Sequence, residues 1–198
     1  MTPAIQLIVN INDAAGLAAI FSGQQAAPVA PTAAATPLIP AVGEYWPGQG
    51  GKLIGLHPKG GYLVAGEPLE GKFQFGRYDQ DLAGFSPTDG ETNTRALVNL
   101  GGTPAAQATY DYTADGHHDF YLPSQTEGAL ILGALGLSHG AFWTSTPFGS
   151  YDAWAVLFER GGVDYWPRLS EFRVRPVRRV IPSFIQPFAV SRGEGAAQ

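Results

Sequence analysis

The sequence predicts a mixed α+β domain of short antiparallel strands with two helices over residues 42–181, preceded by a small N-terminal segment and a proline-rich linker. Short apolar and aromatic runs alternate with glycines throughout this region, and two segments carry helix-start signals. The 26 glycines and 16 prolines favour turns over long helices. With 198 residues, the chain can form one well-buried domain plus short additions.

The first 41 residues differ in composition from the rest. Within residues 1–23, the β-branched run Ile5–Ile11 predicts a strand, and Ala14–Phe21 predicts a short helix. Residues 24–41 hold four prolines among alanines and threonines, so we expect an extended, semi-rigid linker. The segment 1–23 is too small to fold alone, because it can bury too little surface. It either docks on a partner, as the long linker favours, or adds its strand to the main sheet.

Six short runs in the main domain predict strands, because they are rich in β-branched and aromatic residues and are bounded by glycine or proline. They are Lys52–Leu56, Gly61–Ala65, Lys72–Tyr78, Phe142–Ser145, Trp154–Glu159 and Phe172–Val180. In the last run, side chains alternate in direction, and Pro176 predicts an edge or a bulge because it cannot donate to a sheet. A tail, residues 182–198, follows the domain.

Two segments predict helices. The first covers Thr92–Leu100, with a cap at or near Thr92. The second covers Ser124–Leu135, where Ser124 and Glu127 have the spacing of a capping box, in which each side chain satisfies a free backbone N–H. Gly136 suits the end of this helix.

Charge and composition exclude several protein classes. The net charge of −5 argues against nucleic-acid binding driven by excess positive charge. The absence of cysteine excludes disulfides, thiolate metal sites and cysteine nucleophiles. No apolar stretch reaches the ~20 residues that cross a bilayer, so we expect no membrane insertion. No basic residue precedes the first apolar run, so we expect synthesis in a cytoplasm without a secretory signal.

Four motifs follow one another in the second half of the domain: Asp119–Ser124 with Glu127, Phe142–Thr146, Ala153–Phe158 with Gly161-Gly162, and Phe172–Arg178. In this order they resemble a bacterial and prophage lectin-like domain family related to the C-terminal domain of the Legionella collagen-like adhesin. With the preceding Thr92–Val98, they cover about ninety residues, and their order makes the signal more specific than any one motif alone.

This resemblance implies a C-type-lectin-like fold, which is shared with sulfatase-modifying enzymes and with phage receptor-binding proteins. It does not by itself imply a function. The enzymatic relatives rely on cysteines that this chain lacks, and the calcium-binding sugar motifs of animal C-type lectins, Glu-Pro-Asn and Trp-Asn-Asp, are absent. We therefore expect a protein that is not an enzyme.

Several clusters of polar side chains contain residue types that can bind a metal ion. His117-His118-Asp119, with Asp111 and Asp115 upstream, is the strongest, but adjacent histidines on extended chain point to opposite faces, so a polar loop is preferred. Residues 79–81 and 89–91 are better explained as turns than as calcium loops. We expect no metal ion, no cofactor and no catalytic residue.

The predicted recognition surface combines rigid aromatic side chains with a planar hydrogen-bond donor in two loops, Pro147–Asp152 and Val163–Leu169. Its members are Phe148, Tyr151, Asp152, Tyr165, Trp166 and Arg168. The alternative is that Tyr165 and Trp166 only cover the core. Trp143 and Trp154 are predicted to be core residues. The arginines near the end of the domain are expected to pair on the surface with Asp152, Asp164, Glu159 or Glu171.

The favoured function is a phage virion protein, such as a head-fibre, decoration or tail-associated protein. Residues 1–41 would bind a capsid or tail protein and make a homo-oligomer, with a trimer favoured by analogy to fibres. The lectin-like domain would bind a host-surface glycan or protein. The alternatives are a free bacterial adhesin or soluble lectin that binds glycans, and a purely structural protein that stabilises a capsid.

Overall fold

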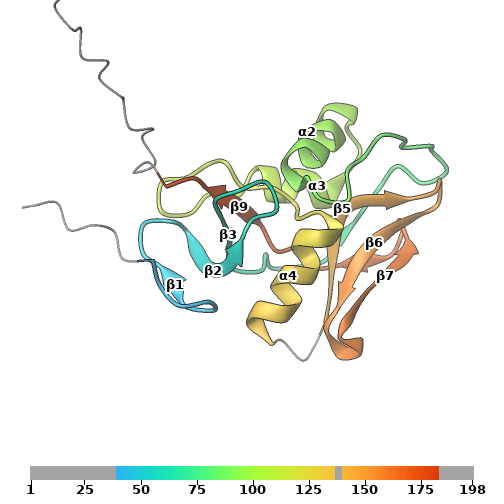
Figure 1. Ribbon diagram of the computed structural model, residues 1–198. Helices are drawn as coiled ribbons and strands as arrows, with labels where there is room; N and C mark the ends of the chain where they lie inside the picture. Colours follow the sequence, from blue (N-terminus) through green and yellow to red (C-terminus); the bar gives the residue numbers. More distant parts are fainter. Residues whose placement is uncertain (1–38, 137–139, 183–198) are drawn as a thin grey trace, which may run out of the picture. The chain divides into compact units, whose positions relative to one another are not determined.

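The computed structural model describes residues 39–136 and 140–182 (Figure 1). The predicted N-terminal strand and helix, most of the linker and nearly all of the tail lie outside these residues. The described part is a mixed α+β structure with small antiparallel sheets and three α-helices, which confirms the predicted fold class.

The first sheet contains the earliest and the last strands of the described region. Its order is β1 (Tyr45–Trp46), β2 (Gly51–Leu56), β3 (Tyr62–Ala65) and β9 (Val177–Val180), with all neighbours antiparallel (Figure 1). The last strand, β9, is thus hydrogen-bonded to β3, which comes from the early part of the described region.

The second sheet is a three-stranded meander, in which β5 (Ala141–Phe148), β6 (Asp152–Leu157) and β7 (Gly162–Pro167) follow one another. A 3₁₀ turn, η1 (Phe158–Arg160), joins β6 to β7. A two-residue ribbon, β4 (Phe73–Gln74) with β8 (Glu171–Phe172), completes the set. The strand β7 occupies a segment that the sequence predicted to be a loop.

Three α-helices follow β4 and precede β5 along the chain: α2 (Gly90–Leu100), α3 (Pro104–Tyr110) and α4 (Gln125–Leu135). The capping box at Ser124 and Glu127 is confirmed, and Gly136 ends α4 in the left-handed conformation. Helix α2 begins earlier than predicted, because the side chain of Asp89, not Thr92, caps it. Helix α3 was not predicted.

Two predicted strands are shorter in the structure. The run Lys72–Tyr78 contributes only the two residues of β4, and Phe172–Val180 divides into β8 and β9. Pro176 lies between these two strands, as expected of a residue without a backbone donor.

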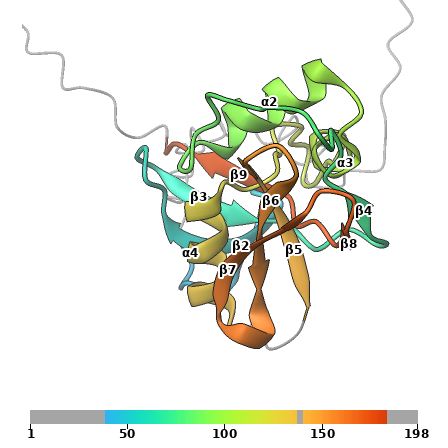
Figure 2. The same ribbon diagram turned by 90° about the vertical axis from the view of Figure 1, so that its right-hand side faces the viewer.

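The meander stands between α4 on one side and β4 with β8 on the other (Figure 2), and a cluster of the hydrophobic core lies on each side of it. On the side of α4, Phe142 and Val156 pack with residues of the first sheet and with Ile131 of α4. On the side of β4 and β8, Trp143, Ala153 and Ala155 pack with Phe75, Leu97 and Val174. Side chains that alternate along the meander therefore enter different surroundings on its two faces.

Candidate functional site

Three aromatic side chains form a continuous exposed cluster on the α4 side of the meander. The rings of Phe148 and Tyr165 are stacked, with centroids 4.3 Å apart and planes 23° from parallel. Trp154 meets both edge-on, with centroids 5.3 Å from Phe148 and 5.8 Å from Tyr165. We call these three residues the aromatic platform.

The pairing of the strands explains the platform. Trp154 of β6 is directly opposite Tyr165 of β7, and two residues further along the same face Val156 is opposite Val163. The two valines pack in the core cluster of α4, whereas Phe148 and Tyr165 are 42% and 47% exposed. The platform therefore extends the helix-covered face of the sheet beyond the part that is buried.

A second exposed pair lies near the turn between β5 and β6. Tyr78 and Tyr151 have ring centroids 5.2 Å apart. The Tyr151 hydroxyl donates a hydrogen bond to Asp79, and this bond with the neighbouring negative charge raises the pKa of Tyr151 above its ordinary value. Tyr78 comes from the loop after β4, so this pair joins two distant parts of the sequence.

Arg168 connects the 77–80 loop to the turn between β5 and β6. Its side chain is fully buried. Its guanidinium donates to the carbonyl oxygens of Asp152 (2.9 Å), Arg77 (2.8 Å), Gln80 (2.9 Å) and Gly149. Burial lowers the pKa of Arg168. Four of its five N–H groups donate to backbone carbonyls and the side chain is fully buried, so Arg168 positions the exposed aromatic residues and does not itself face a ligand.

The predicted recognition residues thus occupy three environments. Phe148 and Tyr165 lie together in the platform, and Tyr151 lies at the neighbouring turn. Asp152 is half-buried at the start of β6 and contributes its carbonyl oxygen to Arg168. Trp166 faces the opposite side of β7 from Tyr165 and packs edge-on against Phe172, with centroids 5.7 Å apart.

The prediction for the tryptophans was right for Trp143 and wrong for Trp154. Trp143 is fully buried and donates from Nε1 to the carbonyl oxygen of Phe73 (2.7 Å). Trp154 is half-buried at the centre of the platform. The flanking Ala153 and Ala155 point into the core, and the alternation of the strand therefore turns Trp154 outward.

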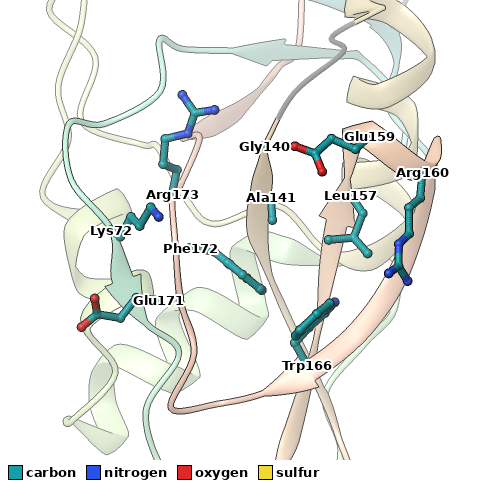
Figure 3. Close-up of a pocket in the computed structure, with 10 residues that line it drawn as sticks. All are labelled: Lys72, Gly140, Ala141, Leu157, Glu159, Arg160, Trp166, Glu171, Phe172 and Arg173. Carbon is teal, nitrogen blue, oxygen red and sulfur yellow. The ribbon is translucent and has the colours of Figure 1, made fainter.

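A cavity of about 550 Å³ opens on the other face of the meander, beside β4 and β8 (Figure 3). The indole of Trp166 and the ring of Phe172 form its aromatic part. Charged side chains of both signs surround them. The lining residues are Lys72, Gly140, Ala141, Leu157, Glu159, Arg160, Trp166, Glu171, Phe172 and Arg173.

Glu127 is a fully buried carboxylate. It accepts hydrogen bonds from His57 Nε2 (2.7 Å) and the Tyr121 hydroxyl (2.7 Å), and from the backbone N–H groups of Ser124 (2.7 Å) and Gly90 (3.1 Å). The last two belong to the first turns of α4 and α2, so one carboxylate caps two helices. The capping-box motif predicted only the Ser124 contact.

These hydrogen-bond donors stabilise the ionised form of Glu127. Burial alone would raise the pKa of Glu127, but the hydrogen bonds from His57, Ser124 and Tyr121 outweigh it, and the pKa lies below its ordinary value. His57 Nδ1 accepts the backbone N–H of Lys59 (3.0 Å), so the ring proton is on Nε2 and points at Glu127. The group is a closed hydrogen-bond network in the interior.

The residues considered for a metal site turn to separate partners. Asp115 accepts from the Tyr45 hydroxyl (2.7 Å), and His117 Nε2 hydrogen-bonds the carbonyl oxygen of Gly48 (2.8 Å). Asp119 holds Arg178 through both carboxylate oxygens (2.8 and 3.0 Å). Within residues 39–136 and 140–182, no three His, Asp or Glu side chains come together in a metal-binding arrangement.

The arginines pair differently from the prediction. Arg178 is buried and bound to Asp119, a residue that was not among the expected partners. Arg175 is buried and donates to the carbonyl oxygen of Gly66 (3.0 Å). Arg160 approaches an expected partner, Asp164, at a distance of 3.9 Å.

None of the helices in the described part of the chain is long and apolar enough to cross a membrane. No protein-family model matches the chain, and no curated protein matches it.

Proposed function

We propose that the domain is a non-catalytic binding module that uses the aromatic platform to bind carbohydrate on a surface. The observation that carries this proposal is the exposure of Phe148 and Tyr165 in a stacked arrangement, although the neighbouring valines on the same face are covered by a helix. Contiguous exposed aromatic area is costly in water and is typical of a binding surface.

Carbohydrate suits the chemistry of the platform. The C–H bonds on one side of a pyranose ring form a flat apolar face, and aromatic rings stack on such faces through dispersion and their electron-rich centres. Tyr165 also has a hydroxyl, which can hydrogen-bond a sugar hydroxyl at the edge. Because Arg168 locks the nearby turn to the 77–80 loop, binding costs little ordering entropy.

A binding role is preferred to catalysis because the buried cluster of acid and base side chains, His57, Tyr121 and Glu127, is closed off. His57, Tyr121 and Glu127 are exposed by only 5%, 3% and 0%, and their hydrogen bonds go to one another or to backbone. A reacting group would have to displace these bonds before it reached them.

We also propose that this α+β fold is C-type-lectin-like. The four motifs that carry the family resemblance occupy successive parts of the structure: the segment entering α4, then β5, β6 with η1, and finally β8 with β9. An experimental structure of the chain would test the proposal, and a different strand order in either sheet would overturn it.

The setting that we propose is a phage particle, to which residues 1–41 attach the domain. The resemblance supports this setting, together with the apolar head and the proline-rich linker in the sequence. Mass spectrometry of purified virions should find the protein on particles. Its presence in infected-cell lysate but never on virions would overturn the setting, and deletion of residues 1–41 should abolish particle association.

Carbohydrate binding is tested with the full-length chain on a glycan array, followed by titration calorimetry with the strongest ligand. Tyr165→Ala and Trp154→Ala should each weaken binding about fivefold or more, since stacking contacts contribute on the order of 1 kcal/mol. Tyr110→Ala is the matched control, because Tyr110 is also 47% exposed and lies on α3. A silent array, or equal losses in control and test variants, would refute the platform.

The free adhesin or soluble lectin is the second candidate, favoured by the same platform. It predicts two outcomes: the full-length protein would be absent from virions, and the variant that lacks residues 1–41 would keep its glycan affinity.

A further inference from the structure

The cavity beside Trp166 has the features of a second, independent ligand site on the opposite face of the meander from the platform. We propose that it binds an acidic saccharide unit, that is, one or two sugar rings bearing a carboxylate. This site does not depend on the aromatic platform, because the side chains of Tyr165 and Trp166 point to opposite sides of β7.

The first argument is an unsatisfied donor. The Nε1 atom of Trp166 is buried and has no hydrogen-bond partner among the described residues. A buried donor without an acceptor costs about 1–3 kcal/mol, and native structures rarely leave one unpaired. By contrast, the buried indole of Trp143 is satisfied by a backbone carbonyl. A ligand oxygen beside Trp166 would remove the cost.

The second argument is space. Gly140 and Ala141, at the start of β5, are the smallest residues of the lining, and they leave room beside Trp166. The cavity of about 550 Å³ lies within the range of sites for small organic ligands. One or two sugar rings fit such a volume, while a folded protein segment would need a longer groove.

The third argument is the charge near the indole. Arg160 forms an ion pair with Asp164, which shares a face of β7 with Trp166. This ion pair is long (3.9 Å), and the two side chains are 70% and 47% exposed, so it holds Arg160 only weakly. Lys72 points into the cavity in Figure 3, and its ammonium has no hydrogen-bond or ion-pair partner within the described residues. Both cations are thus available to a carboxylate.

The acidic residues of the lining do not cancel this preference. The carboxylate of Glu171 is turned away from Trp166, and that of Glu159 is directed toward the Gly140 side (Figure 3). Glu159 can accept hydrogen bonds from hydroxyl groups. A lining with cationic donors, one indole N–H and a carboxylate acceptor matches a ligand whose hydroxyls both donate and accept, and the rings of Trp166 and Phe172 match its apolar face.

The test uses nitrogen-15-labelled full-length protein, whose four tryptophans give four indole N–H resonances. Trp166→Phe identifies the resonance of Trp166. Titration with D-glucuronate should shift that resonance in a saturable manner, whereas D-glucose should shift it much less at equal concentration. Phenylacetate, which has a carboxylate and a ring but no hydroxyls, should also bind more weakly than glucuronate.

Two substitutions examine the cations without touching the core. Lys72→Gln and Arg160→Gln should each weaken glucuronate binding roughly tenfold, the effect of one charge-assisted hydrogen bond. Lys52→Gln is the charge-matched control on β2 and should change the affinity less than twofold. Tyr165→Ala should also leave it unchanged, so failure of the platform and failure of the cavity site are distinguishable.

Three results would overturn the inference. The first is an unchanged Trp166 resonance with all three ligands. The second is an equal response to glucose and glucuronate, which would remove the carboxylate preference. The third is equal weakening by Lys72→Gln and Lys52→Gln, which would reduce the effect to net charge.

Discussion

Replacing Glu127 by glutamine should destabilise the domain by about 2–4 kcal/mol, although the side chain keeps its shape. The carboxylate accepts four hydrogen bonds at 2.7–3.1 Å. An amide offers one acceptor oxygen and introduces an NH₂ donor in place of the other oxygen. The oxygen must stay beside the backbone N–H groups of Ser124 and Gly90, which cannot reorient, so the NH₂ must face His57 and Tyr121.

The magnitude follows from what those two partners can do. The Tyr121 hydroxyl can rotate and accept from the new NH₂. His57 cannot make the same change, because its Nδ1 already accepts the backbone N–H of Lys59. One buried donor is therefore left unpaired, at a cost of about 1–3 kcal/mol, and the two backbone bonds lose the strength that the charge supplied.

The measurement is urea unfolding of the full-length protein at pH 7, followed by tryptophan fluorescence. Glu91→Gln is the control, because Glu91 is also in the first turn of a helix but forms an exposed pair with Arg95. That substitution should cost less than about 0.5 kcal/mol. If Glu127→Gln loses less than about 1 kcal/mol, the idea that one carboxylate holds two helix ends is wrong.

The same residue predicts a pH dependence. The pKa of Glu127 is lower in the folded protein than its ordinary value. Its contribution is therefore present above the unfolded-state pKa and is lost as pH falls through the folded-state pKa. The stability difference between wild type and Glu127→Gln should be greatest near neutrality and shrink in acid. A constant or growing difference across an acid titration of the unfolding free energy would contradict this sign.

Other substitutions test packing and positioning. Arg168→Lys should lower the free energy of unfolding by about 2–3 kcal/mol and increase amide exchange in the 77–80 loop, because a lysine ammonium cannot reach all four carbonyl oxygens that the guanidinium binds. Unchanged amide exchange in this loop would exclude the positioning role. Gly51→Ala should destabilise by about 1–3 kcal/mol, since the added Cβ would lie 2.2 Å from the carbonyl oxygen of Ala65. Gly133→Ala, at an exposed position in the last turn of α4 with nothing within 4 Å of the added Cβ, should instead stabilise the protein by up to about 1 kcal/mol and raise its melting temperature.

Features that depend on neighbouring residues were predictable from the sequence. Helix α4 is the clearest case, because its capping box and its terminal glycine act within a few residues of one another. Strand interruption at Pro176 is another, since the missing N–H acts at the residue itself. The short helix α3 was missed because its N-cap residue, Thr103, makes no side-chain cap hydrogen bond and its seven residues are too few for a clear periodicity.

The side that a residue faces was predictable only in part. Alternation along β6 separates Trp154 from Ala153 and Ala155, but both faces of the meander are partly buried, and the sequence does not say which face is left open. The outward position of Trp154 followed from where α4 packs. Tyr165 and Trp166 were grouped as one surface, and the formation of β7 placed them on opposite sides.

The sequence by itself determined the α+β class, the ends of α4 and most of the aromatic residues at the candidate site, because composition, capping and strand periodicity are local properties. Only the tertiary structure decided that Arg168 holds a loop about 90 residues away and that Glu127 also caps α2. It alone decided that Trp166 lines a cavity. The physical reason is that burial and hydrogen-bond partners are set by segments far apart in the chain, and one sequence does not encode their positions locally.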